Sequence, residues 1–443
     1  MEKGLALACR YRRGLCPGQA DRQMRKLRTL FVVAWISGSC IASFGQSYRN
    51  FQDELTEVRD RFKMRFGPFR VLPIFRLSNV GFDDNVHNRT AENKPVGDYT
   101  GTVSPEIKVY FLAGRSLILS FADNPEYLYY VKEDSLRSFT NSFVPGARLR
   151  LFNRFVLSGE YHFQKHQRRV FSEFSRLVTD TVKGTMAGFF YETPRGTSIG
   201  FSGTSDRFLY EDIVLPDYEA RFSRTLNRKE KTGNIEFYYR LFSESYFFAK
   251  FGATTYRFED LSSRWRDSRS TQVSGGLRFP IIGRARGTLS LGYKRFVPED
   301  PGRKDFSGLI ADTNLDYRFG RFVVRLGLGR DNHFSYLSET FYYVENRAEA
   351  GLSLYLSRPL RIDYDLRYGE LRYPEPFRIS GSVQPFLEIS RKDVHRTHSV
   401  GVTIAIIRNT GIQLSYNIFD RTSNAPGFNI KRNFIGISLT QDF

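Results

Sequence analysis

From about residue 70 onward, apolar and polar side chains alternate along most of the chain. In the stretch 361–368, the even positions are Ile362, Tyr364, Leu366 and Tyr368, and the odd positions are Arg361, Asp363, Asp365 and Arg367. The stretches 99–112 and 155–164 alternate in the same way. Successive side chains of a strand point to opposite faces, whereas a helix would scatter these charges around its circumference. The pattern therefore predicts strands with one apolar and one polar face.

The alternating stretches are long enough to cross a membrane, since a tilted barrel strand needs about 10 residues. Short turn candidates lie at 113–115, 152–154, 193–196, 242–245, 283–286, 319–321, 357–360 and 408–410. Longer polar stretches lie between them, at 84–98, 211–228, 259–270, 297–306, 374–392 and 420–429. Short turns that alternate with long loops are typical of an outer-membrane barrel, in which the short turns face the periplasm.

The turn candidates also predict the number of strands. Eight short hairpins supply sixteen strands, and the stretches 70–83 and 430–443 add one at each end. We therefore expect an all-β protein, a transmembrane antiparallel β-barrel of about eighteen strands. Residues 226–231 could replace 242–245 as a turn, which leaves sixteen strands as the alternative. A soluble propeller or sandwich is disfavoured, because the apolar faces are too long and too aromatic for water.

The last strand carries a candidate membrane-insertion signal, formed by Ile435, Ile437, Leu439 and Phe443 on one face. A membrane barrel has no free edge, so its final strand must pair with its first. This end resembles the C-terminal recognition signal of bacterial outer-membrane barrels, which closes on an aromatic residue. Gln441 departs from that pattern, in which an apolar or aromatic residue is usual.

The beginning of the chain is typical of a secretory signal peptide. Arg25, Lys26 and Arg28 are basic, residues 30–36 are apolar, and Ser43 and Gly45 are small residues before Gln46. We therefore expect an N-terminal extension and signal peptide at 1–45, a short periplasmic helix or tail at 46–68, and the barrel at 69–443. Lipidation of Cys40 is the alternative to cleavage. Loss of residues 1–45 would remove all three cysteines.

Charge and hydropathy narrow the class of partner. The net charge is +19, and it falls to +13 without residues 1–45, which hold eight basic and two acidic residues. Nucleic acid is an unlikely partner of an exported chain whose bases alternate with acids. The expected partners are outer-membrane lipids and lipopolysaccharide, the barrel-assembly machinery, and polar solutes or polysaccharide. No run of about 18 apolar residues supports a membrane-spanning helix, and the mean hydropathy is −0.40.

The chain shows no strong signal for catalysis, a metal or a cofactor. Residues 83–85 offer three oxygen side chains at a loop start, fewer than the six or more ligands that Ca²⁺ takes. His395 and His398 fall on opposite faces of a regular strand, which disfavours a metal pair. His162 lies near Glu160, but a hydrolase also needs a nucleophile, so we expect no enzymatic activity.

The candidate functional site is a set of charges on the polar faces of the strands between residues 312 and 367. It comprises Asp312, Asp316, Arg318, Arg321, Arg325, Glu345, Arg347, Glu349, Arg361, Asp363, Asp365 and Arg367. A basic side chain at the lipid midplane costs about 2–4 kcal/mol, so we expect these residues to face the lumen. They could impose a transverse field on a water-filled pore or interlock and close a narrow barrel. About eighteen strands leave room for a channel.

Four stretches resemble a family of bacterial β-barrel porins encoded beside exopolysaccharide genes. Residues 67–73 and 80–86 are similar to its first strand, and residues 226–230 with 237–241 are similar to its mid-barrel hairpin. The resemblance implies a single-chain outer-membrane barrel connected with polysaccharide export or surface assembly, and it brings no catalytic residues.

We therefore expect a passive channel for small polar or anionic solutes or polysaccharide, with a longer outer loop narrowing its mouth. A closed barrel that serves as an assembly or adhesion scaffold is the alternative. About 23 residues separate the signal peptide from the first strand, which disfavours a plugged siderophore-type transporter.

Overall fold

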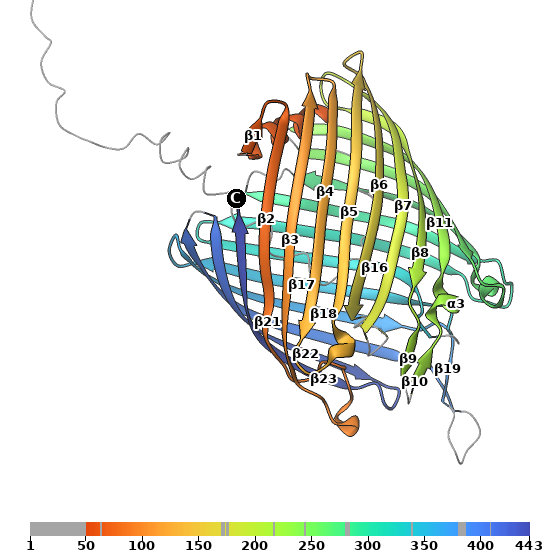
Figure 1. Ribbon diagram of the computed structural model, residues 1–443. Coiled ribbons are helices and arrows are strands. Elements are labelled where there is room, and N and C mark those ends of the chain that lie inside the picture. The colour runs from red at the N-terminus through yellow and green to blue at the C-terminus, as the bar shows by residue number, and fades with distance from the viewer. Residues whose placement is uncertain are drawn as a thin grey trace, which may run out of the picture. The chain divides into compact units, whose positions relative to one another are not determined.

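The computed structural model describes residues 50–62, 64–169, 173, 177–215, 218–242, 245–279, 284–337, 340–379, 387–407 and 409–443. The predicted signal peptide and its cysteines lie outside the described residues. The chain divides into the units Met1–Phe44 and Gly45–Phe443. All described elements belong to the second unit, shown in Figure 1.

Helices are few and short among the described residues. The α-helices are α2 (Phe51–Arg61) and α3 (Phe222–Leu226), and the 3-10 helices are η1 (Ala91–Asn93), η2 (Asp134–Leu136) and η3 (Leu261–Arg266). None of the helices in the described part of the chain is long and apolar enough to span a membrane.

Eighteen antiparallel strands form one closed sheet, as the turn count predicts. They are β2 (Phe69–Asp83), β3 (Asp98–Ala113), β4 (Leu117–Tyr130), β5 (Ser138–Leu151), β6 (Phe155–Arg169), β7 (Leu177–Glu192), β8 (Ser198–Tyr210), β11 (Arg228–Phe242), β12 (Ser245–Phe258), β13 (Ser268–Phe279), β14 (Ala285–Pro298), β15 (Phe306–Phe319), β16 (Phe322–Phe334), β17 (Tyr342–Tyr355), β18 (Leu360–Arg372), β21 (Lys392–Ile407), β22 (Thr410–Ser423) and β23 (Ile430–Asp442). Short strand β1 (Met64–Phe66) pairs with β2, and the pairs β9 (Ile213–Leu215) with β10 (Tyr218–Ala220) and β19 (Phe377–Ile379) with β20 (Leu387–Ile389) lie in connections. Barrel strands that are consecutive along the chain are paired in the sheet, so the barrel is an up-and-down meander (Figure 1).

The eight predicted short turns all join neighbouring strands at one end of the barrel. At the first of them, Gly114 has a φ of +63°, a conformation that glycine adopts without strain. The alternative turn at 226–231 is wrong, because Leu226 ends α3 and β11 begins at Arg228. That stretch is therefore a strand start rather than the mid-barrel hairpin that the resemblance implied. By the usual orientation of such barrels, the short turns mark the periplasmic end.

The barrel closes between its first and last strands. β2 pairs with β23 from Ile74 opposite Asp442 to Asp83 opposite Phe434. Two hydrogen bonds to carboxylates stabilise the end of this seam that lies away from the short turns. Arg432 Nε donates to Asp83 at 2.9 Å, and Asn433 Nδ2 donates to Asp84 at 2.7 Å. The oxygen-rich stretch 83–85 therefore serves barrel closure. It begins a loop, as the sequence suggested.

The outer face of the barrel is apolar along alternate residues. On β23, the side chains of Ile435 and Ile437 are half exposed, and the Phe443 amide donates to the Pro73 carbonyl at 3.2 Å. Leu439 shares their face by alternation. These four residues lie where an insertion signal requires them, but recognition by the assembly machinery stays a prediction.

Candidate functional site

The inner face of β15–β18 carries the predicted charges. The side chains of each strand form two alternating sets. One set includes large exposed apolar side chains such as Leu309, Leu326 and Leu352 and forms the outer face, so the other set faces the lumen. That set contains Asp312, Asp316, Arg318, Arg325, Glu345, Arg347, Glu349, Arg361, Asp363, Asp365 and Arg367. Arg321 requires a correction: it lies exposed in the turn between β15 and β16, because the strand ends at Phe319.

A glycine makes room for the central ion pair of this wall. Arg325 on β16, Gly351 on β17 and Asp365 on β18 lie directly opposite one another. The guanidinium reaches across Gly351, and its Nε and Nη2 donate to Asp365 Oδ1 at 3.0 and 2.7 Å. A Cβ at position 351 would lie 2.2 Å from that oxygen. The ion pair across three strands therefore depends on the missing side chain between them.

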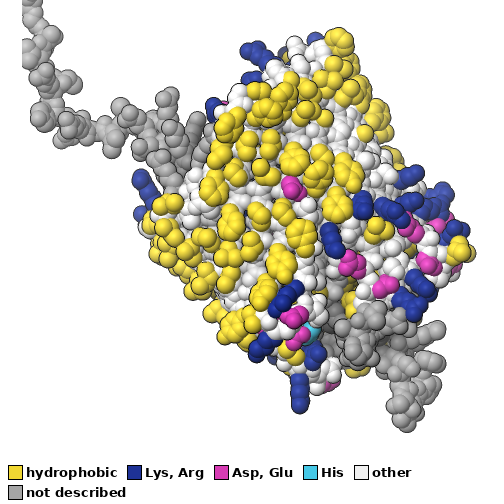
Figure 2. All heavy atoms as spheres, viewed as in Figure 1, with side chains coloured by type: hydrophobic (Ala, Val, Ile, Leu, Met, Phe, Trp, Pro, Cys, Tyr) yellow, Lys and Arg dark blue, Asp and Glu magenta, His cyan; other side chains and the backbone are white. Residues whose placement is uncertain are grey.

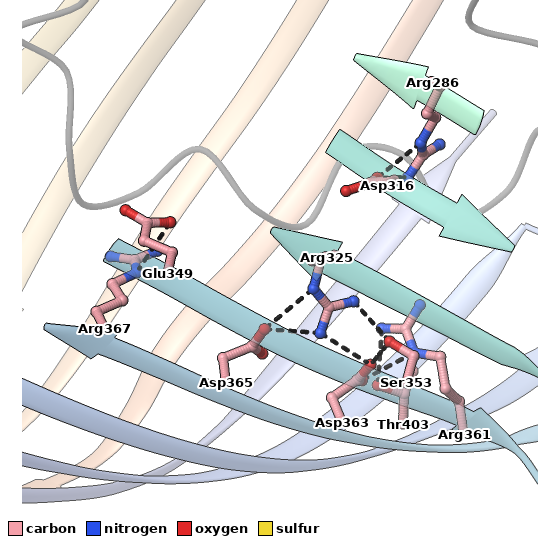
Figure 3. A network of polar contacts seen from close by, with 10 residues as sticks. All are labelled: Arg286, Asp316, Arg325, Glu349, Ser353, Arg361, Asp363, Asp365, Arg367 and Thr403. Carbon is pink, nitrogen blue, oxygen red and sulfur yellow. Dashed lines mark hydrogen bonds and ion pairs between the residues drawn. The ribbon is translucent and has the colours of Figure 1, made fainter. Parts of the chain in front are cut away.

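Figure 3 shows this ion pair within a larger network. Arg325 Nη1 donates to Ser353 Oγ at 2.6 Å, and the Ser353 hydroxyl donates to Asp363. Arg361 Nε donates to Asp363 at 2.8 Å, and its Nη2 donates to Thr403 Oγ1 at 3.3 Å. The network ties β16, β17, β18 and β21 together. Each charge has a hydrogen-bonded counter-charge, which offsets the cost of removing it from water.

Further charges of the set form separate pairs along the same wall. Arg286 on β14 donates from Nε to Asp316 on β15 at 2.7 Å. Glu349 lies between two bases, 3.3 Å from Arg347 Nε and 3.8 Å from Arg367 Nε. The wall from β14 to β21 is therefore a ladder of ion pairs.

The lumen beside this ladder is open to water. Asp312 and Asn314 face inward on β15, yet both are exposed. Asp312 makes no ion pair with any residue that the structure describes. An inward side chain stays exposed only where the space beside it is wide enough for water. The barrel is therefore not filled by side chains at this level.

The connection between β16 and β17 folds into the lumen at the outer end. β16 stops pairing with β15 at Arg330 but stays paired with β17 as far as Phe334. The Phe334 ring lies 5.1–5.7 Å from the rings of Tyr256, Phe258 and Phe296, which belong to β12 and β14. The end of this hairpin has therefore left the wall. We call residues 335–337 and 340–341 the inward segment.

A buried arginine holds the inward segment. Arg266, on η3, donates to the carbonyl oxygens of Ser335 at 2.8 Å, Leu337 at 2.6 Å and Thr340 at 3.1 Å. Its side chain is almost fully buried, and this burial lowers its pKa to about 10. One guanidinium thus holds the inward segment through hydrogen bonds to three of its carbonyl oxygens.

A buried carboxylate holds the same segment from another side. Glu173 accepts a hydrogen bond from the Tyr336 amide at 2.6 Å and another from the Ser335 hydroxyl. Complete burial raises the Glu173 pKa to about 7, although these hydrogen bonds and the nearby Arg391 and Arg266 oppose the shift. The Tyr336 ring packs with residues of β7, β8 and α3, namely Val178, Tyr210, Phe222 and Leu226. The inward segment therefore crosses the lumen from β16–β17 to β7–β8.

At the opposite end, helix α2 lies in the periplasmic mouth. Its residues Phe51, Leu55 and Val58 are buried, as is Phe62 just beyond it. This spacing places them on one helical face. The helix has contacts on several strands. Arg240 and Tyr246 donate to Asp53 at 3.0 and 2.5 Å, Glu192 accepts from the Phe51 amide at 2.9 Å, and Arg148 pairs with Glu54. The Phe62 ring meets the Tyr110 ring edge to face, with 5.0 Å between the ring centroids.

These partners face inward on β3, β5, β7, β11 and β12. The helix predicted between 46 and 68 therefore exists, but it occupies the lumen mouth. We expected these 23 or so residues to be too few for a plug domain, and the position of a single short helix in the mouth was not predicted. The apolar residues at 51, 55, 58 and 62 have helical spacing, which was a sequence signal for a packed helix. The aromatic run 341–343 was a comparable signal for the inward segment.

Comparison with known proteins identifies the family. The family model described as "Putative beta-barrel porin 2" matches residues 63–443. The chain belongs to this family of porins. It is accordingly an outer-membrane β-barrel of the channel-forming class, and not an enzyme. None of the curated proteins compared with the chain matches it.

Solved structures of Pseudomonas outer-membrane proteins are among those similar to this porin. OpdK of Pseudomonas aeruginosa is 10% identical, with 84% of this chain and 98% of that chain covered and a TM-score of 0.46. OccK2 (OpdF) of Pseudomonas aeruginosa is 11% identical over 84% and 98%, with a TM-score of 0.47. A BenF-like porin of Pseudomonas fluorescens Pf-5 is 10% identical over 85% and 98%, with a TM-score of 0.45.

His395 and His398, which the sequence placed on opposite faces of a strand, lie on opposite faces of β21. His162 Nε2 lies 3.0 Å from Asp206 Oδ1 on the inner wall. His398 Nδ1 lies 3.0 Å from the Tyr364 hydroxyl on the outer face, whereas His395 is on the inner face. Within the described ranges, no three His, Cys, Asp or Glu side chains lie close enough to hold a metal ion.

Proposed function

We propose that this porin is a passive channel for small polar solutes, anions included, and that the ladder on β14–β21 orients them during passage. The observation that carries the proposal is the exposure of Asp312 and Asn314 inside the barrel. Paired charges along one wall of a water-filled section create a local field, which favours solutes with separated charges or strong dipoles. A net charge of +13 without residues 1–45 favours anions over cations.

Two elements set the size of solute that passes. The inward segment narrows the outer end, and α2 narrows the periplasmic end. A long polysaccharide would have to keep both elements displaced for as long as it passes through the channel. Small solutes need only the space beside them, and for this reason we favour small solutes over a polymer.

Planar-bilayer recording of the purified wild-type protein tests the channel. We expect stepwise current increases in KCl and a reversal potential that indicates anion preference. Liposome swelling with a neutral monosaccharide, gluconate and a disaccharide then compares solutes by charge and size. Neutral and anionic monosaccharides should enter faster than the disaccharide. Absence of current steps at every salt concentration would contradict the proposal.

A closed barrel that acts as an assembly or adhesion scaffold is the second candidate. The observation that favours it is the occupation of both lumen ends by packed elements. The two functions differ when α2 is released from the wall, for example by Asp53→Asn combined with Glu54→Gln. A channel narrowed by α2 should then conduct more current, whereas a closed scaffold should stay silent.

A further inference from the structure

The outer face of β8 and β11–β14 changes from apolar to basic side chains along the strands. One row across these strands and β15 is apolar and exposed, and it comprises Phe201, Ile235, Phe251, Val273, Tyr293 and Leu309. Two residues further toward the outer end, the row consists of one basic residue, Arg295, and the small residues Gly203, Gly233, Ala253, Thr271 and Ser307. Hydrocarbon contact therefore ends at this row.

Beyond it the same outer face is basic. Lys231 and Arg269 occupy the next row, and Arg207, Lys229 and Arg257 occupy the one after. Their side chains point outward, as those of the apolar row do, and they are exposed. Together with Arg295 they form what we call the basic sector. Figure 2 shows hydrophobic side chains over β2–β6 and charged ones gathered at the edge of the view beyond β8 and β11.

The basic sector lies at the height of the outer membrane interface. On β11, the outward residues run from Leu241 near the periplasmic turn to Lys231, ten residues away. Ten residues of a strand tilted by about 40° rise about 25 Å, the height of the apolar band of such barrels. Lys231 and its neighbours therefore meet lipid head groups.

The positive charges of the sector are not balanced within the protein. Arg207, Lys229 and Arg257 lie directly opposite one another on adjacent strands, and like charges in that position repel. Three carboxylates compensate in part. Glu259 accepts from Arg207 at 2.7 and 2.9 Å, and Glu299 lies 3.3 Å from Arg269 and also pairs with Arg257. Asp267 accepts from Arg257 Nη1 at 3.1 Å. Lys229, Lys231 and Arg295 make no ion pair within the described part of the chain.

Other sectors of the outer face differ at the same end of the barrel. On β3–β5 the outward residues there are aromatic, namely Tyr99, Tyr127, Tyr129 and Phe139. Across β21–β23, Asp420 lies directly opposite both Arg396 and Lys431. Charge there alternates in sign. Uncompensated positive charge therefore does not run around the whole barrel.

We propose that the basic sector binds the phosphate groups of lipopolysaccharide in the outer leaflet. Phosphate accepts several charge-assisted hydrogen bonds from arginine and lysine. The hydroxyl groups of Ser205, Thr255 and Thr271 lie beside the basic residues and add donors. The apolar row directly below supplies the surface for acyl chains. Head-group phosphate and acyl contact at this spacing are the features that lipid A presents.

Native mass spectrometry of the purified full-length protein tests this site. The probes are bis-phosphorylated, hexa-acylated lipid A and the same lipid A with both phosphates removed. The test variant combines Lys229→Gln, Lys231→Gln and Arg295→Gln. The control variant combines Arg396→Gln and Lys431→Gln, which also face outward. A heat-modifiable gel shift verifies that each variant folds.

We expect the wild type and the control variant to retain bis-phosphorylated lipid A, and the test variant to bind it about tenfold or more weakly. Dephosphorylated lipid A should bind all three weakly. Equal binding of both lipids to the wild type would overturn the proposal, because acyl contact alone would then explain retention. Unchanged binding by the folded test variant would overturn it as well.

Discussion

At the scale of single residues, the lumen wall combines long charged side chains with glycines that leave space for them. Arg325 and Asp365 meet over Gly351, and a Cβ on Gly329 would lie 3.2 Å from Arg347. A regular sheet would separate these charges with side chains. The glycines therefore decide which charges can pair across three strands.

Gly351→Ala tests this arrangement. The added methyl group would lie 2.2 Å from Asp365 Oδ1, so the ion pair must open or the strand must shift. We expect a loss of about 1–3 kcal/mol in the free energy of unfolding, measured by urea unfolding in detergent micelles. Gly159→Ala is the matched control, because nothing lies within 4 Å of its added Cβ. Equal stability of the two variants would show that the wall tolerates the methyl group.

Asp365→Asn should change ion selectivity. Removal of this carboxylate leaves the Arg325 guanidinium without its main counter-charge in the lumen, so the local field becomes more positive. The reversal potential in a KCl gradient should therefore shift toward anions, and Arg325→Gln should shift it toward cations. Asp134→Asn, in an exposed loop, should leave it unchanged. Shifts in the same direction for both wall variants would contradict a field set by this pair.

At the scale of elements, two packed segments narrow the lumen, one at each end. Helix α2 is held by its buried apolar face and by ion pairs and hydrogen bonds to inward residues, whereas Arg266 and Glu173 hold the inward segment. Polar contacts of this kind depend on salt and pH more strongly than apolar packing does. Each segment is therefore a place where conditions can change the width of the channel.

Loss of the α2 contacts should raise conductance. Asp53→Asn with Glu54→Gln removes the partners of Arg240, Tyr246 and Arg148. We expect a larger single-channel conductance than in the wild type, with unchanged heat-modifiable migration. Thr56→Ala changes an exposed residue of the same helix and should keep the wild-type value. If conductance stays the same in the double variant, α2 does not narrow the mouth.

The inward segment should respond to pH through Glu173. Burial raises its pKa to about 7, so the folded state binds the proton more tightly than the unfolded chain does. Its contribution to stability is then fully present below about pH 4.5 and is lost as the pH rises through about 7. Conductance should increase from pH 5 to pH 8, and Glu173→Gln should flatten this dependence. An equally steep dependence in the variant would assign it to another group.

At the scale of the whole molecule, stability depends on one seam between residues far apart in sequence. β2 and β23 close the sheet, and closure leaves no free edge in the membrane. Asp83 is almost fully buried there and pairs with Arg432 at 2.9 Å. The seam is therefore the contact on which the barrel as a unit depends.

Arg432→Gln should weaken the barrel as a whole. The variant leaves the buried Asp83 without its main counter-charge, and removal of one partner of such a pair costs about 3–5 kcal/mol. We expect the folded band on a gel to convert to the unfolded band at a lower temperature than in the wild type. Lys431→Gln, the outward neighbour, should convert at the wild-type temperature. Identical conversion of both variants would show that other contacts dominate closure.

The sequence by itself determined the barrel. Alternation is a local property, so the stretches around 155–164 and 361–368 indicate their strands, and the two faces of each strand, without knowledge of any partner. Turn spacing then determined the number of strands, since each short turn joins neighbours. The same alternation assigned the lumen-wall charges, except at Arg321, where the strand ends before it.

Only the tertiary structure decided what occupies the lumen. The contacts of α2, and those of Glu173 and Arg266 with residues 335–341, join parts of the chain about 70 to 190 residues apart. No local pattern encodes such pairs, because they exist only after the sheet has closed and brought opposite walls together. The pairing of Arg325 with Asp365, rather than with a nearer charge, likewise depends on the register of three strands.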